Sequence, residues 1–322
     1  MCPFLCGGNM VNFGEIFRYF PTNIAILLDK ELKRSDVNYN LLEEIRLRVN
    51  QPMLLRFGQE EDVMNHLVQT EEILETLQHI CDNSIYSYQK QICNGYITVK
   101  GGHRIGISGS VVMTEEKISN MNYISQLNFR IARQVLGCSN RLIPYVVNSE
   151  ENTIFHTLIV SEPGAGKTTI LRDLIRRVSD GIEAMKLKGK TVAMVDERGE
   201  LAAMYRGIPQ NDIGMRTDVL DNVQKDVGMK MLIRSMSPQV IVADEIGSKE
   251  DVQAIQYAVC CGIKGVFTAH GGSIEEIRLN PALSELIEKT IFERIIFLNQ
   301  ERKGEIKKVY ALNKRTGDYV VI

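Results

Sequence analysis

The chain has 322 residues, of which 44% are hydrophobic and 24% charged, and its formal net charge at pH 7 is -2. This length predicts about two domains with ample material for buried cores, and no apolar run approaches the ~20 residues that a membrane-spanning helix needs. A net charge so close to zero argues against a bulk electrostatic grip on nucleic acid and is compatible with a local basic patch.

The N-terminus has no basic region followed by an apolar stretch, so we expect no signal peptide. Seven cysteines occur at irregular spacing, and a chain of this size needs no disulfide staples. We interpret them as reduced thiols of a cytosolic protein. No CxxC pair is present, so we expect no zinc site.

Residues 1 to about 35 are predicted to be helical. Phe13, Ile16, Phe17 and Phe20 recur at helical spacing, and a second helix opens after Pro21. Such a stripe is typical of a core. The alternative is a docking face for a partner or for the membrane surface.

Alternating and apolar-periodic stretches then predict a mixture of strands and helices up to about residue 150. Strands are predicted at 44–49, 53–57 and 122–133, helices at 70–80, 84–92 and 139–147, and a hairpin around Gly101 and Gly102. We therefore expect residues 1–150 to form a small α+β domain without a catalytic cluster of its own.

The second half, residues 151–322, changes character. Continuous apolar runs alternate with helical patterns and predict strands at 157–160, 191–195, 240–243 and 265–268. This pattern predicts an α/β domain with a parallel sheet that is covered on both faces. Ligands of such sheets bind at the carboxyl ends of the strands, where the functional residues are expected.

The first of these strands leads into a phosphate-binding loop. The loop residues are Ser161, Glu162, Pro163, Gly164, Ala165, Gly166, Lys167, Thr168 and Thr169. Backbone N–H groups at the start of the following helix would surround the phosphates of ATP, Lys167 would reach the β- and γ-phosphates, and Thr168 would bind Mg²⁺. Ser161 stands where the usual motif begins with glycine. The alternative is an ordinary strand, turn and helix in which Gly-Lys-Thr arises by chance.

Acids and a histidine follow the other three strands, at the same edge of the sheet. Asp196 and Glu197 end the second strand, Asp244 and Glu245 the third, and His270 the fourth. Asp244 is predicted to hold Mg²⁺ near the phosphates. Glu197 and Glu245 compete for the role of the carboxylate that activates water, and His270 would donate a hydrogen bond to the γ-phosphate. Each residue alone also has a structural explanation, as a helix cap or a turn residue.

The order of these motifs resembles the type II/type IV secretion ATPase superfamily, whose members are hexameric RecA-like motors of membrane machines. Across nearly the whole chain the sequence is also similar to the stage III sporulation protein AA family. The stretches that carry this similarity are Glu43–Arg48, Ser84–Tyr88, Gly95–Arg104, Leu127–Arg133 and Val195–Arg198. The resemblance implies an ATPase of the mother cell, cytoplasmic or at the inner face of the membrane, that acts with membrane proteins of the channel to the forespore.

The resemblance also implies that arginines of the N-terminal domain reach the phosphates across a domain or subunit boundary. Arg104, Arg130 and Arg133 match that role, with salt-bridged structural arginines as the alternative. We expect a homo-oligomer, a hexameric ring, and no direct binding of nucleic acid. Two other functions remain open from the sequence, namely a nucleic-acid-dependent RecA-like ATPase and a nucleotide-binding scaffold that hydrolyses nothing.

Overall fold

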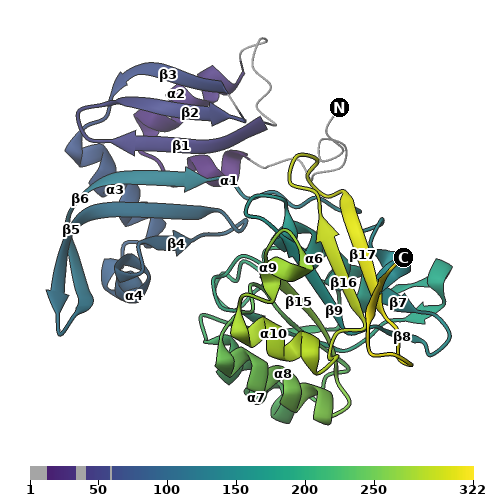
Figure 1. Cartoon of the computed structure of the whole chain (residues 1–322). Helices are drawn as coiled ribbons and strands as arrows, with labels where there is room; N and C mark the ends of the chain where they lie inside the picture. Colours follow the sequence, from purple (N-terminus) through teal and green to yellow (C-terminus); the bar gives the residue numbers. More distant parts are fainter. Residues whose placement is uncertain (1–12, 34–40, 59) are drawn as a thin grey trace. The chain divides into compact units, whose positions relative to one another are not determined.

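The computed structural model describes residues 13–33, 41–58 and 60–322, which fall into two compact units (Figure 1). The N-terminal unit holds the described residues up to Arg133 together with 203–210. The P-loop unit holds residues 134–202 and 211–322. Residues 134–150 thus cluster with the second half of the chain. The segment 203–210 leaves the P-loop unit and belongs to the N-terminal one.

The N-terminal unit is built on an antiparallel sheet whose strand order is β3-β2-β1-β6-β5-β4. Its elements are α1 (Phe13–Phe17), α2 (Thr22–Leu32), β1 (Leu42–Arg48), β2 (Pro52–Phe57), β3 (Glu60–Leu67), α3 (Thr70–Ile80), the 3-10 helix η3 (Ile85–Tyr88), α4 (Gln89–Cys93), β4 (Tyr96–Thr98), β5 (Arg104–Thr114) and β6 (Lys117–Arg130).

The two faces of this sheet differ because side chains alternate along each strand. Ile45, Leu47 and Phe129 are fully or almost fully buried and share one apolar cluster with Ile24 of α2 and Ile73 of α3. The helices therefore cover one face. The alternate residues of the same strands are polar and partly exposed.

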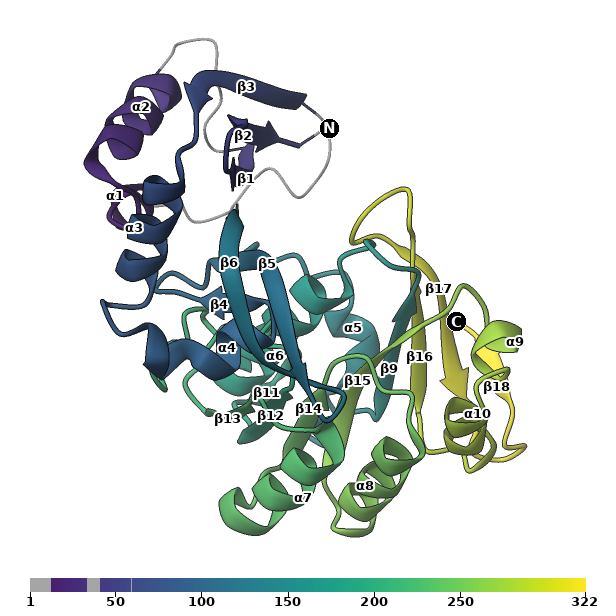
Figure 2. The ribbon, with the colours of Figure 1, turned by 90° about the vertical axis from the view of Figure 1, so that its left-hand side faces the viewer.

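Most predicted elements of this unit are present, with corrected ends. The first helix ends at Phe17 and does not continue to Phe20, and residues 1–12 of the predicted helical region lie outside the described residues. The predicted strand 122–133 is wrong in extent, because β6 begins at Lys117 and ends at Arg130. Together β5 and β6 form a long hairpin (Figure 2).

The P-loop unit is built on a sheet with the strand order β13-β12-β14-β15-β9-β16-β17-β18. Its elements are α5 (Ile143–Val146), β7 (Val147–Asn148), β8 (Thr153–Ile154), β9 (Thr157–Ser161), α6 (Lys167–Asp180), β10 (Gly181–Ile182), the 3-10 helix η4 (Glu183–Met185), β11 (Leu187–Lys188), β12 (Val192–Asp196), β13 (Thr217–Asp221), α7 (Lys225–Met236), β14 (Val240–Ala243), α8 (Lys249–Cys260), β15 (Lys264–His270), α9 (Ile274–Ile277), α10 (Pro281–Glu288), β16 (Arg294–Leu298), β17 (Ile306–Leu312) and β18 (Tyr319–Val321).

The four predicted strands β12, β14, β15 and β9 are adjacent and parallel, as expected. The sheet is mixed rather than purely parallel, because β17 and β18 extend it in antiparallel fashion. Inward residues of these strands form one core cluster with α7, α8 and α10, and the alternate residues are also buried. Both faces are therefore covered, and the strands deliver their carboxyl ends to one edge.

Among the described residues, no helix combines the length and the apolar character needed to cross a bilayer.

Candidate nucleotide-binding site

The predicted phosphate loop connects β9 to α6. All residues of β9 are buried, and α6 begins at Lys167. Gly164 and Gly166 have φ angles of 82° and 90°, in the left-handed region that glycine enters without steric cost. The strand, turn and helix expected from the sequence are therefore present, and their geometry exposes the backbone N–H groups of the first helical turn.

The ammonium group of Lys167 is turned toward the end of β9. It donates hydrogen bonds to the carbonyl oxygens of Ser161 at 2.7 Å and Glu162 at 3.2 Å, and it lies 3.2 Å from Oγ of Ser161. Burial lowers the pKa of Lys167, and the nearby charges of Asp244 and Glu245 oppose that shift. Ser161, which replaces the usual glycine, thus supplies a hydroxyl contact to the lysine.

The two predicted magnesium ligands are in direct contact. Oγ1 of Thr168 donates a hydrogen bond to Oδ2 of Asp244 at 2.6 Å. The hydroxyl of Thr268 also donates to Asp244, and the backbone N–H of Glu245 donates to Oδ1 of Asp244 at 3.1 Å. Hydroxyl and carboxylate oxygens are the ligands that Mg²⁺ prefers, so the residues present fit this ion.

A histidine bridges the lysine of the loop to an acid of the third strand end. Nδ1 of His270 lies 3.1 Å from Nζ of Lys167, and Nε2 lies 3.0 Å from Oε1 of Glu245. Because an ammonium group only donates, Nδ1 must accept, and we assign the imidazole hydrogen to Nε2. Glu245 also pairs with Arg198 through Oε2. Both oxygens of this carboxylate are therefore engaged.

Asp196 stabilises the turn that follows β12. Its carboxylate accepts hydrogen bonds from the backbone N–H groups of Glu200 at 2.8 Å, Leu201 at 3.1 Å and Ala202 at 2.8 Å, and its side chain is buried. Buried Arg172 holds the same turn from the other side by donating to the carbonyl oxygens of Glu200 and Leu201. The turn after β12 is therefore fixed by one carboxylate and one guanidinium.

Glu197, next to Asp196, is paired with Lys225, the first residue of α7. Nζ of Lys225 lies 2.6 Å from Oε2 of Glu197, and the lysine side chain is only 15% exposed. Both residues line a small chamber of about 10 Å³ together with Asp244 and Glu245. This volume corresponds to about one water molecule, so the chamber has room for a single water beside the two candidate bases.

Two residues of the site, Lys225 and Thr268, were not predicted from the sequence. Lys225 lies 28 residues from Glu197, and Thr268 lies 24 residues from Asp244. Thr268 comes from β15, which the sheet register places beside β14. The strand order that makes these contacts cannot be read from spacing along the chain.

The three predicted arginines belong to the N-terminal unit. Arg104 lies across from Arg130 in the β5–β6 register, with its guanidinium 3.9 Å from the centre of the Tyr96 ring. Arg130 ends β6 and is exposed. Arg133 donates to the carbonyl oxygen of Leu42 at 2.7 Å, and burial lowers its pKa. This contact is to a backbone carbonyl and not the salt bridge named as the alternative, so the role of Arg133 at phosphates stays a prediction.

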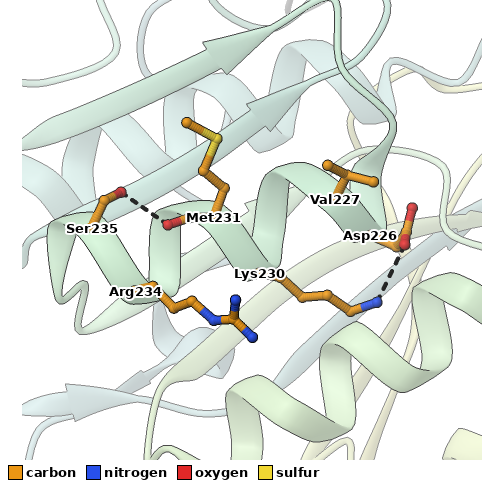
Figure 3. A pocket seen from close by; sticks show the side chains of 6 residues that line it. All are labelled: Asp226, Val227, Lys230, Met231, Arg234 and Ser235. Carbon is orange, nitrogen blue, oxygen red and sulfur yellow. Dashed lines mark hydrogen bonds and ion pairs between the residues drawn. The ribbon is translucent and has the colours of Figure 1, made fainter.

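A second hollow runs along the outer side of α7 (Figure 3). Lys230 pairs there with Asp226 at 3.3 Å, and Ser235 donates to the carbonyl oxygen of Met231 at 2.9 Å. It contains none of the predicted site residues. The lining of this hollow comes from a single helix, and we assign no ligand to it.

Comparisons with known proteins agree on the family. The family model described as "Sporulation stage III, protein AA" matches residues 16–318. The chain is 38% identical over 283 residues to Stage III sporulation protein AA of Bacillus subtilis (strain 168). The aligned region covers 86% of this chain and 90% of the relative. It is 29% identical over 212 residues to the protein ycf45 of Porphyra purpurea, covering 65% of this chain and 35% of that relative.

Solved structures show the same fold. The Legionella pneumophila ATPase DotB aligns with a TM-score of 0.58 and 13% identity, covering 91% of this chain and 82% of DotB. The pilus retraction motor PilT with bound ADP aligns with a TM-score of 0.53 and 15% identity, covering 92% and 80% of the two chains. The P-loop unit is therefore RecA-like, with a smaller unit before it. On its sequence and fold, the chain belongs to the Sporulation stage III, protein AA family.

Proposed function

We propose that the chain binds ATP with Mg²⁺ at the edge of the RecA-like sheet and hydrolyses it. The observation that carries the proposal is the convergence of Lys167, Thr168, Asp244, Glu245 and His270 in one connected set of contacts. If the Gly-Lys-Thr sequence had arisen by chance, its side chains would not be expected to contact the acids and the histidine at the ends of two other strands.

Binding would exchange contacts that Lys167 now makes within the loop. Its ammonium group would leave the carbonyl oxygens of Ser161 and Glu162 for the β- and γ-phosphates. Thr168 and Asp244 would hold the magnesium ion, which when bound neutralises charge that develops on the transferred phosphoryl group. His270, whose Nε2–H faces Glu245, would hold the side chains of Lys167 and Glu245 in fixed positions relative to each other.

Glu197 is the better candidate for the general base. Of its two carboxylate oxygens, only Oε2 has a partner among the described residues, Lys225, which leaves Oε1 for a water in the chamber. Both oxygens of Glu245 are already engaged, by His270 and Arg198. A base must reach the proton it removes, so an unengaged oxygen beside a water-sized chamber favours Glu197.

The active unit would be a homo-oligomeric ring, a hexamer, that works on membrane proteins of the sporulation channel between mother cell and forespore. The family assignment and the fold shared with DotB and PilT support this proposal. The ring would lie in the cytoplasm at the inner face of the membrane. Arg104 or Arg130 would complete the site of a neighbouring chain.

Phosphate release tests the enzymatic proposal. The purified chain should release phosphate from ATP at a steady rate with Mg²⁺ and stop when EDTA removes it. A burst of one phosphate or fewer per chain without turnover, together with tight binding of a fluorescent ADP analogue, would instead identify a nucleotide-binding scaffold.

A further inference from the structure

The polar face of the N-terminal sheet gathers arginines that are scattered through the sequence. The register pairs Glu44 of β1 with Arg130 of β6, and Arg130 with Arg104 of β5. Two residues further along β1, Arg46 lies across from Asn128, and Asn128 from Gly106. Residues paired in this way lie on one face of the sheet.

A third row continues the same pattern. Arg48 of β1 lies across from Gln126 of β6, and Gln126 from Ser108 of β5. Successive rows are about 6.6 Å apart, twice the rise of a strand residue. We call these three rows the arginine face. Its four arginines and one glutamate give it a formal charge of +3 in a chain whose net charge is -2.

The last two rows line a hollow of about 230 Å³. Its walls include Arg46, Arg48, Ser108, Gln126 and Asn128, and glycines at 95 and 106 leave space where other residues would place side chains. The hollow therefore combines two guanidinium groups, two amides and one hydroxyl, all on rigid strands of a single unit.

The polar groups of this hollow are not all used within the protein. Among the described residues, Arg48 and Arg130 have no hydrogen bond or ion pair from their side chains, whereas Arg46 pairs with Glu44 at 2.7 Å. Oδ1 of Asn128 is buried and accepts no hydrogen bond from a described residue. Because buried polar atoms are nearly always hydrogen-bonded, a missing donor is a reason to look for a ligand.

Contrary to the expectation drawn from the net charge, which left room only for a local basic patch, we propose that the arginine face binds single-stranded nucleic acid, with its phosphates on Arg46 and Arg48 and a base over Asn128 and Gln126. Guanidinium groups match phosphate oxygens in a bidentate manner. Asparagine and glutamine amides donate to and accept from base edges.

The shape of the face favours the same ligand. An open sheet face suits a single strand because a duplex keeps its bases stacked inside. An acidic peptide would pair its carboxylates with the arginines, and its carboxylates would offer no donor for the amide oxygens of Asn128 and Gln126.

Fluorescence anisotropy of a labelled, mixed-sequence 20-nucleotide DNA strand tests this proposal with the full chain. Without ATP, the unmodified chain should bind at 50 mM salt, and its affinity should fall with added salt. The Arg46→Ala/Arg48→Ala variant should bind about tenfold or more weakly, and its salt slope should shrink by about 1.4, or ~0.7 for each lost phosphate contact. Gln126→Ala should weaken binding and leave the salt slope unchanged.

The matched control is Lys90→Ala, which removes one positive charge from exposed α4 outside the hollow and should bind like the unmodified chain. Arg48→Glu provides a second variant in case the double variant fails to fold, as judged by circular dichroism. No binding by the unmodified chain, or equal loss in Lys90→Ala, would overturn the proposal. Displacement of the DNA by polyglutamate at equal charge concentration would overturn it in favour of an acidic peptide. Because the assay contains no ATP, its outcome does not depend on ATP hydrolysis.

Discussion

Oγ1 of Thr168 donates a hydrogen bond to Oδ2 of Asp244 across 2.6 Å, although 76 residues separate the two in the chain. The contact forms because β9 and β14 both flank β15, so their carboxyl ends lie at one edge of the sheet. Thr168 is the second residue of α6, the helix after β9, and Asp244 directly follows β14. The pair joins the phosphate loop to the acid that is predicted to bind the same magnesium ion.

The first prediction separates the two candidate bases. Glu197→Gln should lower kcat by about 10²-fold or more while ATP still binds, because the water loses its proton acceptor. Glu245→Gln should have a smaller effect, since Glu245 is engaged by His270 and Arg198. Single-turnover kinetics with both variants checks this, and the reverse order of effects would assign the base to Glu245.

Lys225 is predicted to position Glu197. Lys225→Met should reduce kcat by roughly tenfold and leave KM for ATP unchanged. The reason is that the ammonium group of Lys225 contacts the carboxylate of Glu197 at 2.6 Å and contacts no residue of the phosphate loop. Lys225→Arg should restore part of the rate. The control is Lys230→Met on the same helix, whose half-buried pair with Asp226 lies outside the site. A rise in KM alone would mean that Lys225 binds nucleotide directly.

His103 should make stability depend on pH. Burial lowers its pKa from 6.5 to about 4, with the charge of Glu15 opposing the shift, and Nδ1 accepts a hydrogen bond from the N–H of Ala132 at 3.0 Å. The unfolded chain takes up this proton below pH 6.5 and the folded chain only near pH 4. Stability contributed by neutral His103 is therefore present above pH 6.5 and is lost as pH falls toward 4, by up to about 3 kcal/mol.

Urea unfolding followed by circular dichroism between pH 7 and 4 measures this effect. His103→Gln keeps an acceptor and removes the titration, so its stability should fall less over that range than that of the unmodified chain. His79→Gln, on the partly exposed side of α3, is the control. Parallel pH curves for His103→Gln and the unmodified chain would contradict the assignment.

The sequence predicted the site better than it predicted the N-terminal sheet. Each strand of the site is a continuous apolar run whose functional residue stands at its carboxyl end or in the loop that follows, so local pattern and parallel topology suffice to bring Lys167, Asp244 and His270 together. The β5–β6 hairpin was missed because its turn consists of Glu115 and Glu116, which adopt φ of 50° and 62° without the glycine or asparagine that usually marks such turns.

The arginine face could not be predicted from the sequence for a related reason. Arg46 and Arg48 of β1 are far in sequence from Arg104 and from Arg130, and even spacing of charge along the chain hides the patch that strand register creates. Lys225 was likewise missed because its contact with Glu197 depends on the order of strands in the sheet. Contacts set by register and strand order carry no signature in the spacing of a single sequence.

Mixed rings test whether an arginine acts across a subunit boundary. Lys167→Ala chains and Arg104→Ala chains should each be inactive alone, because a donor from outside the loop is worth about 10³–10⁵ in rate. Mixtures of the two should regain part of the activity, since some interfaces then pair an intact loop with an intact arginine. Arg130→Ala is tested in the same way. No recovery, together with a monomeric mass at all ATP concentrations, would leave an arginine that acts within its own chain.

Lys167→Ala tests the central claim most directly. The substitution removes the ammonium that now contacts Ser161, Glu162 and His270 and that is proposed to hold the phosphates. Steady-state phosphate release with ATP and Mg²⁺ should be abolished in Lys167→Ala and unchanged in Lys188→Ala, an exposed lysine on β11, with circular dichroism showing both chains folded. Unchanged ATP hydrolysis by folded Lys167→Ala would contradict the account.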